Sequence, residues 1–289
     1  MHSEENTYSV LSRFLPSKID QGSSNALLDR WAEEVTTINN YTFDNGVTGL
    51  GWLIAFLIQR EHIGGNVDEI LEDVDDNIYK FTIKSILSEP TNVDQLLELV
   101  TFYQQRFTDG IANHNFYRKF SHFECMKLLT EKLNAFLSEV PVDDENLCTK
   151  INILLKYSYL AESGIIETLV EEAFYSQIEK LIIYFNGTEP TRFTEGLMIS
   201  LLKFLVCVKQ YQNSHWTERI TKAYLDLKMA LNEKYKNAST IAIWEKVCFS
   251  IPQPRLRYEE DQSYWQSEKG KHLLFILYTN VRSFELSCN

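Results

Sequence analysis

Five segments of the chain are apolar on nearly every side, and longer segments that are apolar on one side only alternate with them. A helix that is apolar all round has to be buried, whereas an amphipathic helix packs one face and shows the other to water. The apolar segments begin near residues 46, 92, 147, 195 and 240, a spacing of roughly 45 to 55 residues that is typical of a repeated helix pair. This alternation predicts an inner layer of buried helices and an outer layer that covers it.

The predicted outer helices are amphipathic, and the segment 68–87 illustrates their pattern. Ile70 and Ile78 lie on its predicted apolar face, while Asp75 and Asp76 lie on the opposite, polar face. The expected outer helices span about 24–39, 68–87, 117–138, 165–185, 214–236 and 261–280, and the expected inner helices span about 46–57, 93–107, 147–160, 197–211 and 241–251.

Strand signals are nearly absent, because no period-2 stretch is longer than a few residues, so we expect an all-α protein. Stacked helix pairs can close into a short or incomplete α/α toroid, or they can remain an open α-solenoid. Inner helices this apolar favour the closed form, because both helices of a solenoid pair usually keep a face in water. We expect an N-terminal arm over residues 1–23 and a single toroid-like domain of about five to six helix pairs over residues 24–289.

The charge of the chain limits its partners. The formal net charge is −12 at pH 7, so nucleic acid and anionic membrane, which bind basic surfaces, are not expected as partners. A cationic peptide or a basic patch on another protein would suit this charge, although acidity also serves solubility. We expect a cytoplasmic protein, because there is no secretory signal and the five cysteines form no Cys-x-x-Cys pair.

Three glycines fall within six residues at the start of the first apolar segment, in Asn45-Gly46-Val47-Thr48-Gly49-Leu50-Gly51-Trp52. Glycine in a helix allows another backbone or a ligand to come close. This segment, with the apolar residues 53–57 behind it, resembles the glycine-rich start of an inner helix in lanthionine synthetase C-like proteins. The likeness is greatest to the short bacterial members from peptide-maturation gene clusters. Residues 194–202 resemble a degraded second copy of the motif.

The resemblance implies an α/α toroid that handles a peptide, in agreement with the two-layer prediction. The family's enzymes bind zinc through two cysteines and a histidine, one cysteine adjoining that histidine, and the metal activates a peptide cysteine for addition to a dehydrated Ser or Thr. No cysteine adjoins a histidine in this chain, so we expect no metal site, no cofactor and no zinc-dependent cyclisation. The candidate binding residues at the inner-helix starts and in the cavity are Asp44, Asn45, Gly46, Gly49, Trp52 and Glu195.

Three functions remain open at this point. We expect a divergent member of the group that binds a peptide, or a partner enzyme that modifies peptides, without catalysing cyclisation. One alternative is an active peptide-modifying cyclase with an unfamiliar site, and the other is a helical-repeat interaction scaffold. No catalytic residue is predicted, and the oligomeric state is open.

Acidic residues at the inner-helix starts allow one further enzyme class. A glycosidase uses two carboxyl groups that face one another across the sugar. Asp44, Asp94 and Glu195 are the acids at these positions, but Asp94 is expected to cap its helix together with Thr91. An acid at the position of Asp44 is also favoured by the helix N-terminus alone, so the signal for glycosidase chemistry is weak.

Two other groups of residues have a functional and a structural interpretation. His122 and Cys125 share a helix face and could supply half of a metal site, although a surface histidine beside a buried thiol is the simpler interpretation. Aromatic residues on the inner segments could line a peptide cleft, and core packing explains them more simply. These aromatic residues are Tyr157, Tyr159, Phe204 and Tyr211.

Overall fold

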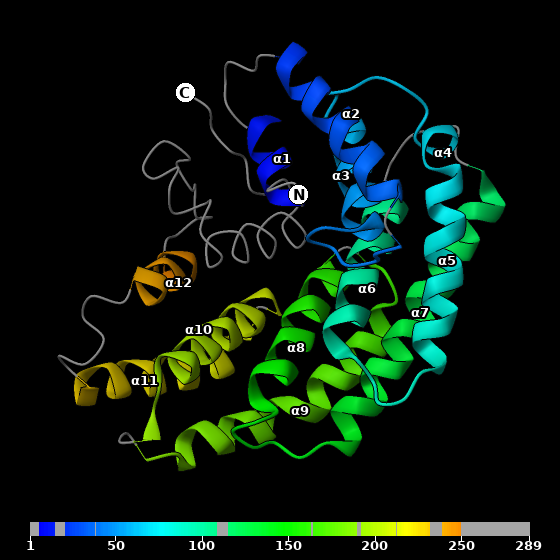
Figure 1. Cartoon of the computed structure of the whole chain (residues 1–289). Coiled ribbons are helices and arrows are strands. Elements are labelled where there is room, and N and C mark those ends of the chain that lie inside the picture. The colour runs from blue at the N-terminus through cyan, green and yellow to red at the C-terminus, as the bar shows by residue number, and fades with distance from the viewer. Residues whose placement is uncertain are drawn as a thin grey trace. The chain divides into compact units, whose positions relative to one another are not determined.

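The computed structural model describes residues 6–14, 21–37, 39–108, 115–162, 164–189, 192–211, 213–231 and 239–249 of the 289-residue chain. Within these ranges every regular element is a helix and no strand is present, which confirms the all-α prediction (Figure 1). None of the described helices combines the length and the apolar character that crossing a membrane requires.

The predicted helices are found, with ends that differ by a few residues. The outer series comprises α2 (Gln21–Thr37), α4 (Val67–Ile70) with α5 (Glu72–Leu87), α7 (Phe116–Glu139), α9 (Glu167–Gly187) and α11 (Ser214–Leu231). The inner series comprises α3 (Val47–Gln59), α6 (Val93–Thr108), α8 (Leu147–Glu162), α10 (Glu195–Gln210) and α12 (Ser239–Phe249). A short helix, α1 (Thr7–Phe14), lies in the predicted arm, and the predicted helix over 261–280 lies outside the described residues.

The chain forms two compact units. Among the described residues the first unit holds 6–132 and the second holds 133–249, so α7 begins in one unit and ends in the other. Within the first unit α3 packs mainly against α6 and also contacts α1, α2 and α5. Within the second unit α10 packs against α8, α11 and α12. The predicted division into an arm and one toroid-like domain stays a prediction.

The glycines at the start of α3 allow a close approach of two backbone segments. A Cβ atom on Gly49 would lie 1.7 Å from the carbonyl oxygen of Phe43, and one on Gly46 would lie 2.6 Å from the carbonyl oxygen of Asn40. No side chain fits at such distances, so the loop 39–46 can lie against α3 only because these residues are glycines. Thr7 of α1 fastens the same loop, because its hydroxyl donates to the carbonyl oxygens of Phe43 (2.5 Å) and Asp44 (2.9 Å).

The helix α10 begins at the degraded copy of the motif and is buried in the same way. Residues 201–208 are all buried, as predicted for an inner helix. A Cβ atom on Gly196 would come no closer than 3.7 Å to Oγ1 of Thr194, which is an ordinary contact. The first copy therefore requires its glycines for packing, and Gly196 of the second copy meets no such requirement.

The prediction of one amphipathic helix over 68–87 is wrong in two respects. The helix is interrupted at Leu71, where α4 ends and α5 begins. Its predicted faces fail at Ile70, which is 47% exposed, and at Asp75, which is only 4% exposed. Asp75 is buried because arginines from two other helices bind its carboxylate, and a periodicity analysis of one helix cannot detect partners that lie elsewhere in the chain.

Candidate functional site

Two acids act electrostatically on Glu98 where α3 and α6 begin, and we call Asp44, Asp94 and Glu98 the acidic site. Asp44 lies in the loop before α3, and the other two lie one turn apart on the same face of α6. Glu98 is half-buried, and its Oε2 accepts a hydrogen bond from the backbone N–H of Phe43 (3.1 Å). This bond holds the loop 39–46 to α6, so the acidic site is built on packed elements.

The electrostatics of the acidic site distinguish Glu98 from an ordinary surface carboxylate. The pKa of Glu98 is raised to about 7, mainly by burial and in addition by the neighbouring Asp94 and Asp44, while the Phe43 N–H opposes the shift. Glu98 is therefore only partly ionised at neutral pH. A cation placed beside it would favour the ionised form, which is how a site of this kind recognises an ammonium or guanidinium group.

The predicted cap at the start of α6 is wrong. Oδ1 of Asn92 accepts a hydrogen bond from the backbone N–H of Gln95 (3.2 Å), so Asn92 caps the helix. The hydroxyl of Thr91 instead donates to Glu89 (3.5 Å). Asp94 is exposed, and its charge acts on Glu98.

The structure separates the predicted binding residues into a packed group and a polar group. Trp52 is 1% exposed and stacks on Phe56 with ring centroids 5.1 Å apart, and Gly46 and Gly49 are also buried. Asn45 is exposed, and its Nδ2 donates to Oδ2 of Asp44 (3.2 Å). Glu195, which begins α10, is half-buried and belongs to the second unit. Of the predicted residues in the first unit, Asn45 is exposed and Asp44 is half-buried, with its Oδ1 shielded from solvent.

Sequence reasoning missed Glu98, the residue on which the acidic site depends. Its spacing of four residues from Asp94 places both on one helix face, but many solvated helices carry such a pair. The signal that separates Glu98 from them is its contact with Phe43, which lies 55 residues earlier in the chain. No pattern within α6 contains that information.

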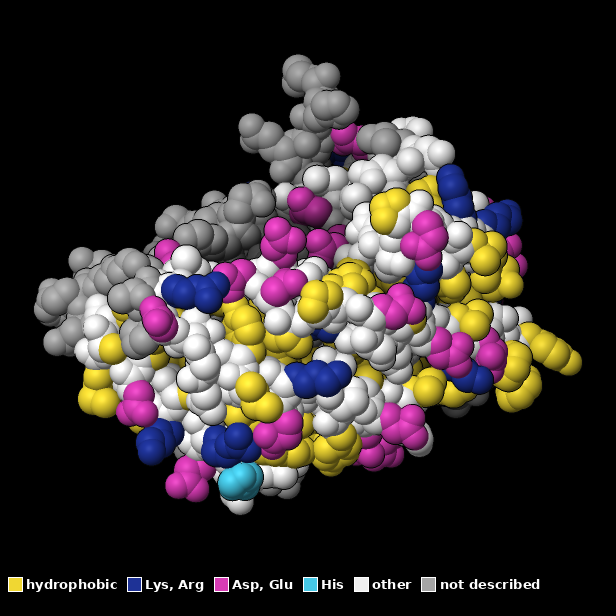
Figure 2. Space-filling view, turned by 90° about the horizontal axis from the view of Figure 1, so that it is seen from below, with side chains coloured by type: hydrophobic (Ala, Val, Ile, Leu, Met, Phe, Trp, Pro, Cys, Tyr) yellow, Lys and Arg dark blue, Asp and Glu magenta, His cyan; other side chains and the backbone are white. Residues whose placement is uncertain are grey.

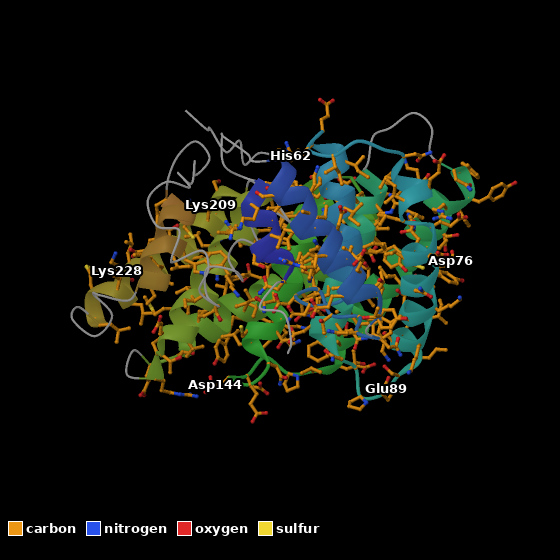
Figure 3. The ribbon with its side chains drawn as sticks, turned by 45° about the horizontal axis from the view of Figure 1, so that its top comes forward. His62, Asp76, Glu89, Asp144, Lys209 and Lys228 are labelled. Carbon is orange, nitrogen blue, oxygen red and sulfur yellow. The ribbon has the colours of Figure 1, made fainter. Side chains whose placement is uncertain are left out.

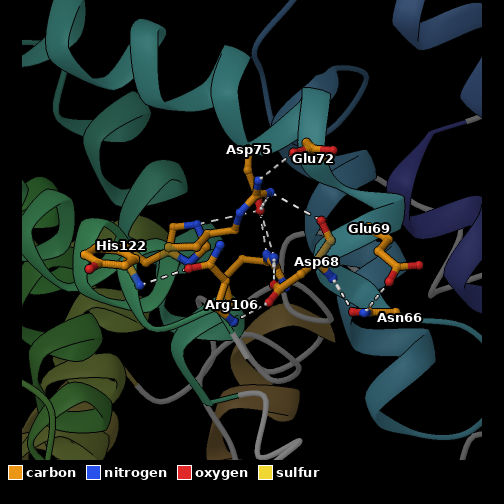
Figure 4. A network of polar contacts seen from close by, with 10 residues as sticks. Asn66, Asp68, Glu69, Glu72, Asp75, Arg106 and His122 are labelled. Atoms are coloured by element: carbon orange, nitrogen blue, oxygen red, sulfur yellow. Dashed lines mark hydrogen bonds and ion pairs between the residues drawn. The ribbon is translucent and has the colours of Figure 1, made fainter. Parts of the chain in front are cut away.

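A second polar cluster, the arginine network, lies at the far end of α6 (Figure 4). The side chain of Arg106 has no exposed surface, and its Nη2 lies 2.7 Å from Oδ2 of Asp75 and 2.8 Å from Oδ1 of Asp68. Arg118 of α7 adds a second guanidinium, with Nη1 3.0 Å from Oδ2 of Asp75 and Nη2 3.5 Å from Oε1 of Glu72. A buried guanidinium needs such partners, because it keeps its charge at any accessible pH.

His122 belongs to this network and is buried, so the prediction of a surface histidine is wrong. Its Nε2 lies 3.8 Å from Oδ2 of Asp75, but burial lowers the pKa of His122 to about 4, and Arg106 and Arg118 act in the same direction. The imidazole is therefore neutral at pH 7. Burial raises the pKa of the nearby Cys125 thiol.

The described residues form no cluster of metal-binding groups. Within these ranges no three His, Cys, Asp or Glu side chains lie close enough together to hold a metal ion. His114 and Cys288 lie outside the described residues.

The second unit buries lysine side chains, whereas the first unit buries an arginine side chain. Nζ of Lys150 donates to the carbonyl oxygen of Leu137 (2.6 Å), and burial lowers the pKa of this amine. Nζ of Lys203 donates to Oδ1 of Asn152 (2.8 Å) and lies 5.6 Å from the ring centroid of Trp244. Burial also lowers the pKa of Lys156 far below its usual range. Sequence reasoning did not predict these buried amines.

The aromatic residues that could have lined a cleft in the second unit are mostly buried. Tyr157 and Phe204 are fully buried and Tyr159 is 4% exposed, which agrees with core packing. Tyr211 is half-buried and stacks on Phe174 with ring centroids 3.8 Å apart.

An open groove of about 1070 Å³ runs along one side of α11, and Figure 3 labels Lys209 and Lys228 from its lining. The face shown in Figure 2 has acidic and basic side chains interspersed, without a large basic area.

Comparison with known proteins identifies no relative of this chain. No family model matches the chain, and no curated protein or solved structure matches it significantly. The resemblance to lanthionine synthetase C-like proteins therefore stays a hypothesis, which rests on residues 45–57 and 194–202.

Proposed function

We propose that this chain binds a cationic peptide, or a basic surface of a peptide-modifying partner enzyme, through the acidic site. In this proposal it is a divergent bacterial, cytoplasmic member of the lanthionine synthetase C-like group that does not perform zinc-dependent cyclisation. Its helix pairs form a short or incomplete α/α toroid, and the ligand binds at an inner-helix start. The observation that carries the proposal is the half-buried Glu98 beside Asp44 and Asp94.

The chemistry of the acidic site favours a lysine or arginine side chain as the ligand group. Glu98 is partly protonated at neutral pH because it is buried beside two other acids. A bound cation stabilises the ionised form, lowers the pKa of Glu98 and releases a proton. Binding is therefore expected to strengthen as the pH rises from 6 to 8. The net charge of −12 also attracts cationic ligands over distance.

Fluorescence anisotropy with a labelled Arg- and Lys-rich peptide that contains no large apolar residue tests this proposal. We expect binding at pH 8 that is weaker at pH 6, and a loss of affinity of about tenfold in Glu98→Gln and in Asp44→Asn, as for removal of one charged partner. Glu98→Gln should also abolish the pH dependence. Glu172→Gln, an exposed acid on α9, is the matched control. Absence of binding, or equal binding by all variants, would contradict the proposal.

A second experiment separates binding from catalysis. The zinc content of the purified protein is measured beside its activity on a dehydrated peptide that contains cysteine. Ring formation with stoichiometric zinc would show that the protein is a cyclase with an unfamiliar site. If Glu98→Gln abolished ring formation without changing peptide affinity, the acidic site would be part of a cyclase and not a ligand site.

A further inference from the structure

Three aromatic side chains at the start of α7 lie largely in water. Phe116 is 74% exposed, Tyr117 is 79% exposed and Phe120 is 56% exposed. Their positions fall on adjacent sides of the first two helical turns, so they form one surface, which we call the aromatic patch. Exposed apolar side chains that are grouped in this way, unlike isolated ones, mark an interaction site.

The aromatic patch is held in place by contacts on both sides of it. The backbone N–H of Asn115 donates to Oδ2 of Asp68 (3.0 Å), immediately before the patch begins. Within the patch, Arg118 binds Asp75 and Glu72 of α5. The start of α7 is therefore fixed against α4 and α5 by the arginine network. A partner that binds the patch does not have to order this helix first, which lowers the free-energy cost of association.

The helices α4 and α5, to which the start of α7 is held through Asp68, Glu72 and Asp75, also carry exposed acidic side chains. Glu69, Asp73 and Asp76 are exposed, and none of them forms an ion pair with a residue in the described ranges. Figure 3 labels Asp76 on α5. The basic residues within the patch are already engaged, since Arg118 is paired with carboxylates and Nζ of Lys119 lies 5.0 Å from the ring centroid of Phe107. The surface therefore combines exposed rings with unbalanced negative charge.

We propose that the aromatic patch and the exposed acids of α4 and α5 are a docking surface for a cationic amphipathic helix of a partner protein. The apolar face of that helix packs on Phe116, Tyr117 and Phe120. Its lysines and arginines reach Asp73 and Asp76 and can also lie over the ring faces. Aromatic anchors surrounded by charge-complementary groups are the common composition of such interfaces.

This surface is distinct from the acidic site. Asp94 lies at the start of α6 and Arg106 lies twelve residues later, which corresponds to about 18 Å along a helix.

Two other occupants of the aromatic patch fit its charges less well than a cationic helix does. A second copy of the chain in a symmetric dimer would bring the same acids face to face, and an anionic membrane would be repelled by them.

The test uses the full chain and a fluorescein-labelled 18-residue helix of leucine and lysine, arranged with one apolar and one basic face. We expect the triple variant Phe116→Ser/Tyr117→Ser/Phe120→Ser to bind at least about tenfold more weakly than the unchanged protein, as for the loss of aromatic anchors. The double variant Tyr175→Ser/Ile183→Ser removes side chains of α9 that are 54% and 68% exposed and should bind like the unchanged protein. A peptide with glutamate in place of lysine should not bind.

A charge variant and a change of salt complete the test. Asp73→Asn/Asp76→Asn should weaken binding and reduce its dependence on salt, whereas Glu172→Gln, which removes an exposed acid of α9, should leave the affinity unchanged. Equal binding by the aromatic variant overturns the proposal. An equal loss of binding in Glu172→Gln would mean that the peptide follows the overall charge of the protein, which overturns it too. A dimer of the unchanged protein that disappears in the triple serine variant assigns the surface to a second copy, which also overturns it.

Discussion

The helices α3 and α10 begin with glycine-containing segments that resemble one another, and both helices are largely buried. Only at α3 does the packing require glycine, because a Cβ atom on Gly49 would lie 1.7 Å from a backbone oxygen. At α10 a Cβ atom on Gly196 would have no neighbouring atom closer than Oγ1 of Thr194, at 3.7 Å. The likeness of the two motifs therefore does not mean that they have the same structural role. The apolar pattern explains why both helices are buried, and the glycines explain a contact that only α3 makes.

The two units also differ in how they accommodate a buried cation. The first unit surrounds Arg106 with Asp68 and Asp75, since a guanidinium cannot release its proton. The second unit gives Lys150 a backbone carbonyl, and burial lowers the pKa of that amine. A lysine can become neutral when it is buried, so one hydrogen bond satisfies it better than it would satisfy an arginine. The buried cation of the first unit is therefore stabilised by ion pairs, whereas the buried Lys150 of the second unit is stabilised by a hydrogen bond to a neutral carbonyl group.

The largest effect is expected for Arg106→Met, which leaves the buried carboxylate of Asp75 with one guanidinium in place of two. Breaking a buried ion pair from one side typically costs about 3–5 kcal/mol, and we expect a loss of unfolding free energy in this range. Urea denaturation at pH 7 measures it. The double variant Arg106→Met/Asp75→Asn should recover part of the loss. A cost no greater than that of Lys150→Met would contradict the contrast between the units.

The second effect tests the two glycine motifs. Gly49→Ala should cost about 3 kcal/mol, because the added methyl group would overlap a backbone oxygen that cannot move alone. Gly196→Ala should be neutral or stabilising by up to about 1 kcal/mol, since alanine is the better helix former and the space is open. Gly51→Ala should fall between them, because its Cβ would meet side-chain atoms of Phe102 and Val74 at 2.8 and 2.9 Å. Thermal and urea unfolding of the three variants give the order, and equal stabilities would refute it.

Most of the fold could be predicted from apolar periodicity, and the polar sites could not. Each of the predicted apolar segments forms a helix in the described structure, because burial depends on the composition of the segment itself. The burial of Asp75 depends on Arg106, which lies 31 residues after it. Glu98 depends in the same way on Phe43. Contacts of this kind leave no pattern within one helix, so a single sequence does not reveal them.

The third effect concerns the pH dependence of stability in the first unit. The pKa of Glu98 is raised from an ordinary value near 4.5 to about 7, so the folded state binds more protons than the unfolded state between these values. The contribution of Glu98 to stability is therefore present at low pH and is lost as the pH rises to 7. Glu98→Gln should gain on the order of 2 kcal/mol relative to the unchanged protein between pH 4.5 and 8. Urea unfolding across this range measures the difference, and a constant difference would show that the pKa of Glu98 is the same in the folded and unfolded states.

The smallest effect is expected for Lys150→Met, which tests the second unit's way of burying a cation. The substitution removes one hydrogen bond to Leu137 but also removes the need to bury an amine, so the net cost at pH 7 should be about 1 kcal/mol or less. Because the pKa of Lys150 is lowered in the folded state, the unfolded chain binds more protons between the lowered pKa and the ordinary value near 10.5. The unchanged protein should therefore gain stability over Lys150→Met as the pH rises toward 10. A cost near that of Arg106→Met, unchanged by pH, would mean that Lys150 is buried as a charged group, and the two units would then bury their cations in the same way.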